Sequence, residues 1–210
     1  MGGNVNYKNN WWSDFGAAHK PRILINTFLR GGPRWRWNEE NYFYFFSGTD
    51  SRKKFNMHAG YVHSEAKQDN FSFKRYVLRF FYQPLNSLSL SLVNEYQQSP
   101  NKTQYVTQTS FNGTPRYILG EIDNESLSST LRVNYNINPN LTIQYYGQPF
   151  IFKAKFSNFN YVTDPMAKNL NDRVAWYNGN QISFADDVYS VDEDGDSAVD
   201  YSFGNPDFAF

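Results

Sequence analysis

The side chains with the most obvious chemistry form an acidic run near the carboxyl end of the chain. Asp192, Asp194 and Asp196 alternate there beside Gly195. Alternating carboxylates around a turn glycine can gather the hard oxygen ligands that Ca²⁺ prefers. The spacing differs from that of an EF-hand loop, which ends in a bidentate glutamate. The run therefore predicts either a calcium site or an ordinary solvated loop.

Three aromatic residues of the same region form a second candidate site. Trp176, Tyr177 and Tyr189 stand among polar residues. Their rings could stack on sugar rings, or they could pack the surrounding loop into a lid. These residues are the candidates for ligand binding, and the sequence leaves both interpretations open.

Other combinations of residues argue against catalysis. Adjacent Asp186 and Asp187 point in opposite directions in an extended chain, so they do not form the facing carboxylate pair of a glycoside hydrolase. His58 and His63 stand at an odd spacing, which places them on opposite faces of a strand and prevents them from sharing a metal ion. The chain contains no cysteine, which excludes disulfides and thiol chemistry. We expect that the protein is not an enzyme.

The elements that position these residues are predicted to be strands. Apolar and polar residues alternate with period two over 88–92, 127–137 and 141–145, whereas no stretch keeps a helical period. The alternation also assigns two faces. Leu90 and Leu131 are expected to face lipid, and their neighbours Ser89 and Arg132 the interior.

Short and long connections alternate along the chain. Turn residues make tight connections at 50–53, 84–86 and 138–140, whereas longer and more polar connections are expected over 65–72, 99–115 and 153–204. We interpret 116–137 as one long strand with a bulge or bend near 123–125. Short periplasmic turns and long extracellular loops are typical of transmembrane barrels. The pattern predicts an all-β, antiparallel up-and-down transmembrane β-barrel, partial and with about eight strands, in which 153–204 is a long extracellular loop.

The composition favours alternating strands. Aromatic residues make up 19% of the 210 residues, yet the mean hydropathy is −0.68. The 20 basic and 20 acidic residues balance, which does not favour a nucleic-acid partner. No apolar run is long enough for a transmembrane helix, and no signal peptide is visible, so we expect a fragment of a longer protein. The alternative is a soluble β-rich carbohydrate-binding domain, because the same faces could enclose a soluble core.

Several short motifs occur in the order in which one family carries them. They are the runs at 29–33 (LRGGP), 49–54 (TDSRKK), 104–106 (QYV), 138–141 (NPNL), 146–150 (YGQPF) and 203–208 (FGNPDF). With them, the chain resembles the C-terminal barrel of the family called domain of unknown function 5916. The resemblance implies a β-barrel of the outer membrane of a Gram-negative bacterium, structural or transport-related, and usually preceded by a family-9-like carbohydrate-binding module.

The resemblance also implies partners. The carbohydrate-binding module is not present in residues 1–210, and the family continues into closing strands beyond the last motif. The expected partners are therefore outer-membrane lipid and the remaining barrel strands, from the same chain or from another. The carbohydrate module links the family to glycan at the cell surface, so glycan is a further candidate ligand. No cofactor is implied.

Overall fold

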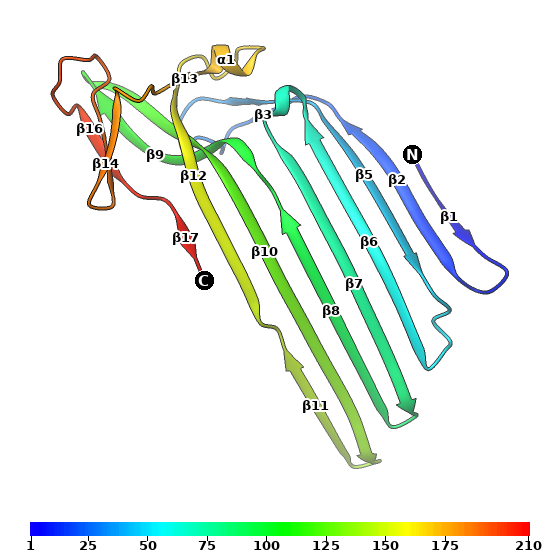
Figure 1. Ribbon diagram of the computed structural model, residues 1–210. Helices are drawn as coiled ribbons and strands as arrows, with labels where there is room; N and C mark the ends of the chain where they lie inside the picture. Colours follow the sequence, from blue (N-terminus) through cyan, green and yellow to red (C-terminus); the bar gives the residue numbers. More distant parts are fainter.

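The computed structural model describes residues 1–210, apart from the side chain of Asp69. It is all-β and antiparallel, as the period-two alternation predicts (Figure 1). The 12-stranded main sheet contains β1 (Gly2–Asn6), β2 (Trp12–Lys20), β5 (Glu40–Gly48), β6 (Phe55–Ala66), β7 (Ser72–Leu85), β8 (Leu88–Gln98), β9 (Asn101–Phe111), β10 (Thr114–Asn138), β11 (Leu141–Gly147), β12 (Phe150–Val162), β13 (Val174–Trp176) and β17 (Phe208–Ala209).

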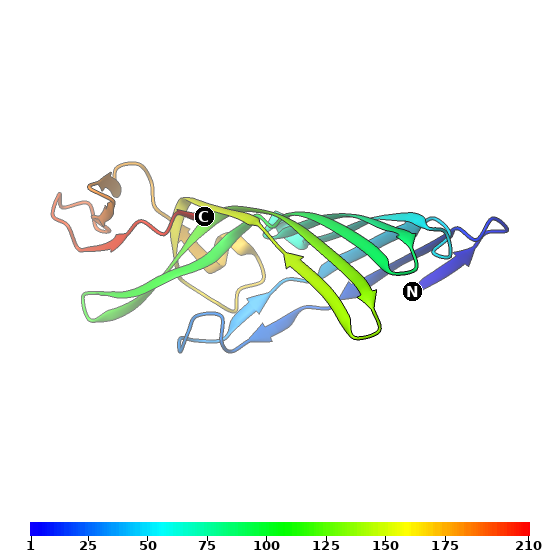
Figure 2. The ribbon, with the colours of Figure 1, turned by 90° about the horizontal axis from the view of Figure 1, so that it is seen from below.

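The main sheet is open and curved, as Figure 2 shows. Its strands follow the order β1-β2-β5-β6-β7-β8-β10-β12-β13, so that β1 and β13 lie at opposite ends of the described sheet. The strands outnumber the roughly eight that were expected, because several short strands with no clear alternation join the sheet as well. The structure shows an antiparallel sheet of neighbouring strands, and the sheet is not closed within residues 1–210.

The strand β10, with 25 residues, confirms the single long strand expected over 116–137. Its first half pairs with β9 and β12, and its second half with β8 and β11. The ladder is irregular between Ile118 and Ile122, slightly before the expected bulge. Pro100 separates β8 from β9, and Pro149 separates β11 from β12. Proline lacks the backbone N–H that pairing in a sheet requires, so the strand that runs beside β10 is interrupted at each proline.

The connection expected over 99–115 is a strand, which corrects the sequence-based prediction. β9 returns into β10 through Asn112 and Gly113, whose φ angles are 48° and 75°. Two successive positive φ values are those of a type I′ hairpin turn. The mostly polar side chains of β9 concealed the strand. The loop expected over 153–204 also starts later, because β12 continues to Val162.

The two faces of the main sheet differ. Directly paired residues of antiparallel strands share a face, and one such row runs across the sheet through Phe15, Phe45, Tyr61, Tyr76, Tyr96, Leu127 and Ile151. The same face carries most of the large exposed apolar side chains, including Phe55, Met57, Leu78, Tyr82, Leu131, Tyr135, Ile143 and Tyr145. We call this face the apolar belt.

The opposite face combines polar side chains with aromatic rings that lie over glycines. Arg75, Arg79 and Arg132 belong to this face by register. The ring of Phe46 covers Gly60, its direct partner on the next strand, and Tyr44 covers Gly16 in the same way. A glycine in a strand permits this close approach because it has no Cβ.

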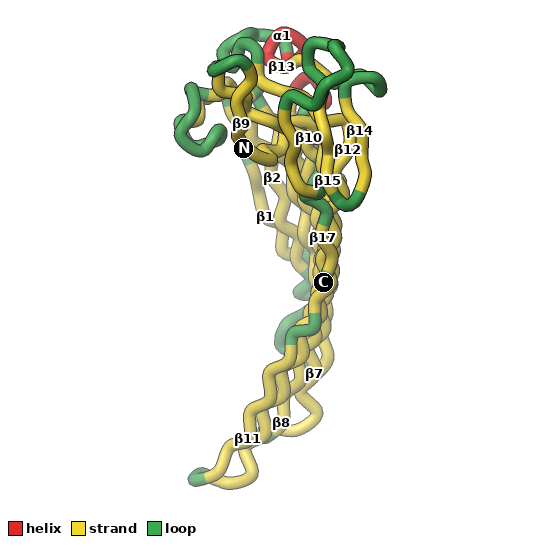
Figure 3. The backbone as a smooth tube through the Cα atoms, turned by 90° about the vertical axis from the view of Figure 1, so that its left-hand side faces the viewer, coloured by secondary structure: helices red, strands yellow, loops and turns green.

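The buried core lies at one end of the sheet, which we call the loop end. Figure 3 shows that the molecule is thin at the other end and thick at this one. The loop end contains β3 (Ile23–Ile25) with β4 (Trp35–Trp37), η1 (Lys67–Asp69), α1 (Leu170–Arg173), and the three-stranded sheet of β14 (Ile182–Ala185), β15 (Val188–Val191) and β16 (Tyr201–Gly204). Two buried apolar clusters form there, one of them around Phe159 and Phe203 and the other around Leu29 and Trp35.

Among the described residues, none belongs to a helix that is both long and apolar enough to span a membrane.

Candidate functional site

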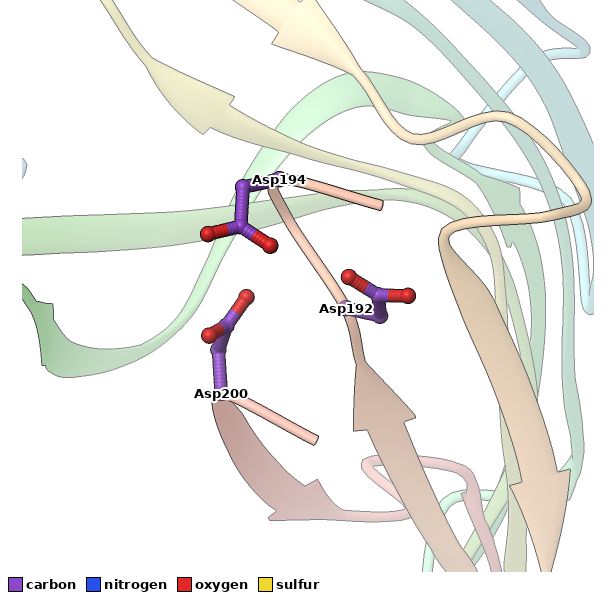
Figure 4. Close-up of side chains that lie close together, drawn as sticks. All are labelled: Asp192, Asp194 and Asp200. Atoms are coloured by element: carbon purple, nitrogen blue, oxygen red, sulfur yellow. The ribbon is translucent and has the colours of Figure 1, made fainter. Parts of the chain in front are cut away.

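The acidic loop between β15 and β16 brings three carboxylates together. One oxygen from each of Asp192, Asp194 and Asp200 lies within 4.8 Å of the others (Figure 4). Backbone N–H groups already bind these carboxylates: Gly195 donates to Asp192 (2.6 Å), and Glu193 donates to Asp200 (2.6 Å). Carboxylate oxygens suit a hard cation such as Ca²⁺, which needs further oxygen ligands beyond three. The same hydrogen bonds also serve to close the loop.

The trio in the structure differs from the expected one. Asp196 is not a member of it, and its carboxylate accepts a hydrogen bond from the backbone N–H of Ala198 (2.8 Å). The reason is Gly195, whose φ of +79° interrupts the alternation on which the expectation rested. Asp200 takes the third place, because its N–H donates to the carbonyl of Val191 and so closes the β15–β16 ladder opposite Asp192.

An ion pair fixes the three-stranded sheet to the main sheet. Arg116 of β10 donates from Nη2 to Glu193 (2.9 Å), and the Glu193 side chain is only 7% exposed. Tyr201 donates to the same carboxylate (2.6 Å), and its hydroxyl lies 2.7 Å from that of Tyr177. Burial, together with the Glu193 hydrogen bond, raises the pKa of Tyr201, and burial also raises the pKa of Tyr177. Both phenols therefore stay neutral, and the network is structural.

A second anchor holds the segment 163–176, which we call the strap. The strap leaves β12 and carries α1 (Figure 1). Its hydrogen bonds reach Arg36 of β4 and Gln68 of η1. Arg173 is fully buried; its Nη2 donates to Asn38 (2.9 Å), and its guanidinium lies 5.2 Å from the ring centre of Trp35. Burial lowers the pKa of Arg173 to about 10. The backbone N–H of Leu170 donates to the side chain of Gln68 in η1 (2.7 Å).

The strap and three strands of the main sheet line an open pocket of about 750 Å³. Its walls come from five separate segments of the chain: η1, β9, β10, β12 and the strap with β13. The lining residues are Gln68, Lys102, Glu121, Asn158, Asn169, Leu170, Asn171, Trp176 and Tyr177. Sequence reasoning missed every lining residue before Trp176, because no local motif indicates that these segments come together.

The three candidate aromatic residues have different surroundings. Trp176, 37% exposed, and Tyr177 both line the pocket. Tyr189 does not line it; its ring lies 4.5 Å from that of Phe159 and 4.4 Å from that of Phe184, measured between ring centres. The packing interpretation thus describes Tyr189, whereas Trp176 and Tyr177 are placed where a ligand could contact them.

The comparisons with known proteins agree with the motifs of the sequence. A search of curated proteins finds no match, and a search of solved structures finds none either. The family model described as domain of unknown function (DUF5916) matches residues 1–191. The chain therefore belongs to this family of unknown function.

Proposed function

We propose that the chain is a wall segment of an outer-membrane β-barrel, structural or transport-related, whose loop end faces the outside of the cell. The observation that carries the proposal is the apolar belt. Soluble proteins rarely expose a contiguous apolar surface of this extent. On an antiparallel sheet with an alternating polar face, lipid is the solvent that such a surface fits.

The belt has the length of a membrane-embedded surface and a polar border at the loop end. Along β10 it extends from Leu127 to Ile137, within the roughly 9–11 residues that a transmembrane strand requires. Just beyond Leu127, towards the loop end, the same face becomes polar in a cross-strand row of His63, Lys74, Gln98, Glu125 and Lys153. Aromatic side chains stand next to this border, as in the girdles of transmembrane barrels.

Polar residues within the belt bind one another. Ser129 donates to the side chain of Asn94 on the neighbouring strand (2.9 Å), and Ser13 donates to Ser47 (3.0 Å). An unpaired polar group would be costly in an apolar environment, whereas a paired one is tolerated. These pairs remove an objection to placing this face in lipid.

The open sheet implies partners. Among the described strands, β1 pairs with β2 alone, so its other edge presents unpaired N–H and C=O groups. Each such group costs several kcal/mol in lipid. We propose that further strands, from the same chain or from another, complete the barrel and cover both edges.

The alternative is a soluble β-rich carbohydrate-binding domain, and the pocket under the strap is the observation that favours it. Under either hypothesis, the link to glycan that the resemblance implies leads us to propose the loop end as the place for a ligand. No catalytic role is proposed.

Detergent dependence and vesicle association separate the two hypotheses. We expect the chain to be monodisperse only in detergent and to float with phosphatidylcholine vesicles in a density gradient. Leu131→Arg, in the belt, should weaken membrane insertion by about 2–4 kcal/mol, whereas Asn134→Arg, on the opposite face of the same strand, should have a much smaller effect. A chain that is monomeric in plain buffer and does not float would contradict the proposal.

A further inference from the structure

We propose that the pocket under the strap binds a neutral oligosaccharide. This inference rests on the proposed function for its biological setting, because it assigns a ligand to the end of the sheet that faces outwards. The chemistry itself follows from the pocket's lining and from its size.

The lining is rich in hydrogen-bonding side chains, and four of them are carboxamides. Six of the nine lining residues carry amide or charged side chains. A carboxamide offers two N–H donors and one carbonyl acceptor, which matches the mixed donor and acceptor character of neighbouring hydroxyl groups. Two of these side chains are already oriented by the fold. Asn158 donates to Glu121 (2.8 Å), and Gln68 accepts from the backbone of Leu170 (2.7 Å).

An aromatic wall accompanies these polar groups. Trp176 lies at the edge of the main sheet, where its backbone pairs with Asn160 of β12, and its indole is partly exposed at the pocket. Tyr177 is held more firmly, because its ring packs at 5.4 Å from Tyr161 and its hydroxyl binds Tyr201. The amphipathic face of a sugar ring stacks on such a surface while its hydroxyls reach the amides. Trp176 is thus the platform, and Tyr177 a fixed part of the wall.

Charge and volume narrow the class of ligand. Lys102 and Glu121 contribute one charge of each sign, so the lining has no net charge and does not select a strongly acidic or basic ligand. The volume of about 750 Å³ falls within the roughly 300–1,000 Å³ of small-molecule sites. This volume has room for several sugar units, and the mostly polar lining does not suit a lipid chain.

Calorimetry with the whole chain tests the inference. The probes are cellohexaose, maltohexaose, xylohexaose and chitohexaose, with hexagalacturonate as the acidic comparison. At least one neutral probe should bind, and hexagalacturonate should bind roughly tenfold more weakly or not at all. Trp176→Ala should weaken the binding at least about tenfold. Trp11→Ala, which removes a 48% exposed tryptophan outside the pocket, should leave the affinity unchanged.

The inference is overturned if no neutral probe binds a chain whose folded state is confirmed by circular dichroism. It is also overturned if Trp176→Ala binds as tightly as the unaltered chain, or if hexagalacturonate is the best ligand. Vesicle flotation of the same preparations keeps the two proposals apart. Flotation without sugar binding removes this inference alone, whereas Trp176-dependent sugar binding without flotation removes only the membrane proposal.

Discussion

At Gly60 the backbone of β6 passes directly beneath the ring of Phe46, its partner on β5. A Cβ at this position would overlap the ring, so the ring must move away from the sheet. We expect Gly60→Val to lower the free energy of unfolding by about 1–3 kcal/mol, measured by urea titration in detergent. Gly204→Val is the control, because nothing lies within 4 Å of the added Cβ there. An equal loss of unfolding free energy in the two variants would show that the packing of the Phe46 ring over Gly60 does not contribute to stability.

The tight turn after β5 contains a carboxylate, that of Asp50, whose pKa depends on the neighbouring Arg52. Arg52 donates to both oxygens of Asp50 (2.9 Å each), and these hydrogen bonds lower the pKa of Asp50 from 3.8 to about 2. Because the pKa of Asp50 is lower in the folded state than in the unfolded state, its pairing with Arg52 stabilises the fold fully above about pH 4. This contribution is lost as the pH falls through about 2. Carbon-detected NMR should show a midpoint near 2 for Asp50, which Arg52→Gln moves back towards 3.8. A midpoint near 4 in both proteins would contradict the pairing.

At the scale of elements, the Arg116–Glu193 pair holds the three-stranded sheet of β14, β15 and β16 against the β9–β10 hairpin. Glu193 is nearly buried, so removing its partner leaves an uncompensated charge, at a cost of about 3 kcal/mol. Arg116→Met should therefore expose the linker near Gly179 to protease while the main sheet stays intact. Limited proteolysis followed by mass spectrometry measures this. The double variant with Glu193→Gln should recover part of the loss, and a double variant as sensitive as the single one would rule out the ion pair as the anchor.

The sequence predicts some elements better than others for physical reasons. β10 could be predicted because its alternation over 127–137 is continuous, and because a hairpin near 123–125 would break the up-and-down order of the strands. β9 could not, since its polar side chains carry little hydrophobic signal. The acidic trio was predicted in part: Asp192 and Asp194 are two residues apart in the chain, whereas Asp200 joins them only through the β15–β16 pairing. The pocket residues before the strap depend wholly on tertiary contacts.

At the scale of the whole molecule, the curved sheet has an apolar face, a polar face, one thick end and two open edges (Figures 1 and 3). The alternation gives the faces, but the strand number and the strap follow from long-range pairing. The account predicts that the belt contacts lipid and that additional strands cover the edges. The open edges are compatible with a membrane barrel and with a soluble assembly. Whether lipid or water contacts the belt distinguishes the two.

A nitroxide scan along β10 therefore tests the central claim most directly. The chain contains no cysteine, so each single cysteine introduced from 127 to 135 carries the only label. In lipid vesicles, labels at Leu127, Leu131 and Tyr135 should collide readily with oxygen and poorly with a water-soluble nickel complex. Labels on the opposite face of the strand, such as one at Arg132, should show the reverse. Collision rates that alternate with period two in this sense are the predicted result. High nickel accessibility along the apolar belt, with no response to lipid, would contradict the account.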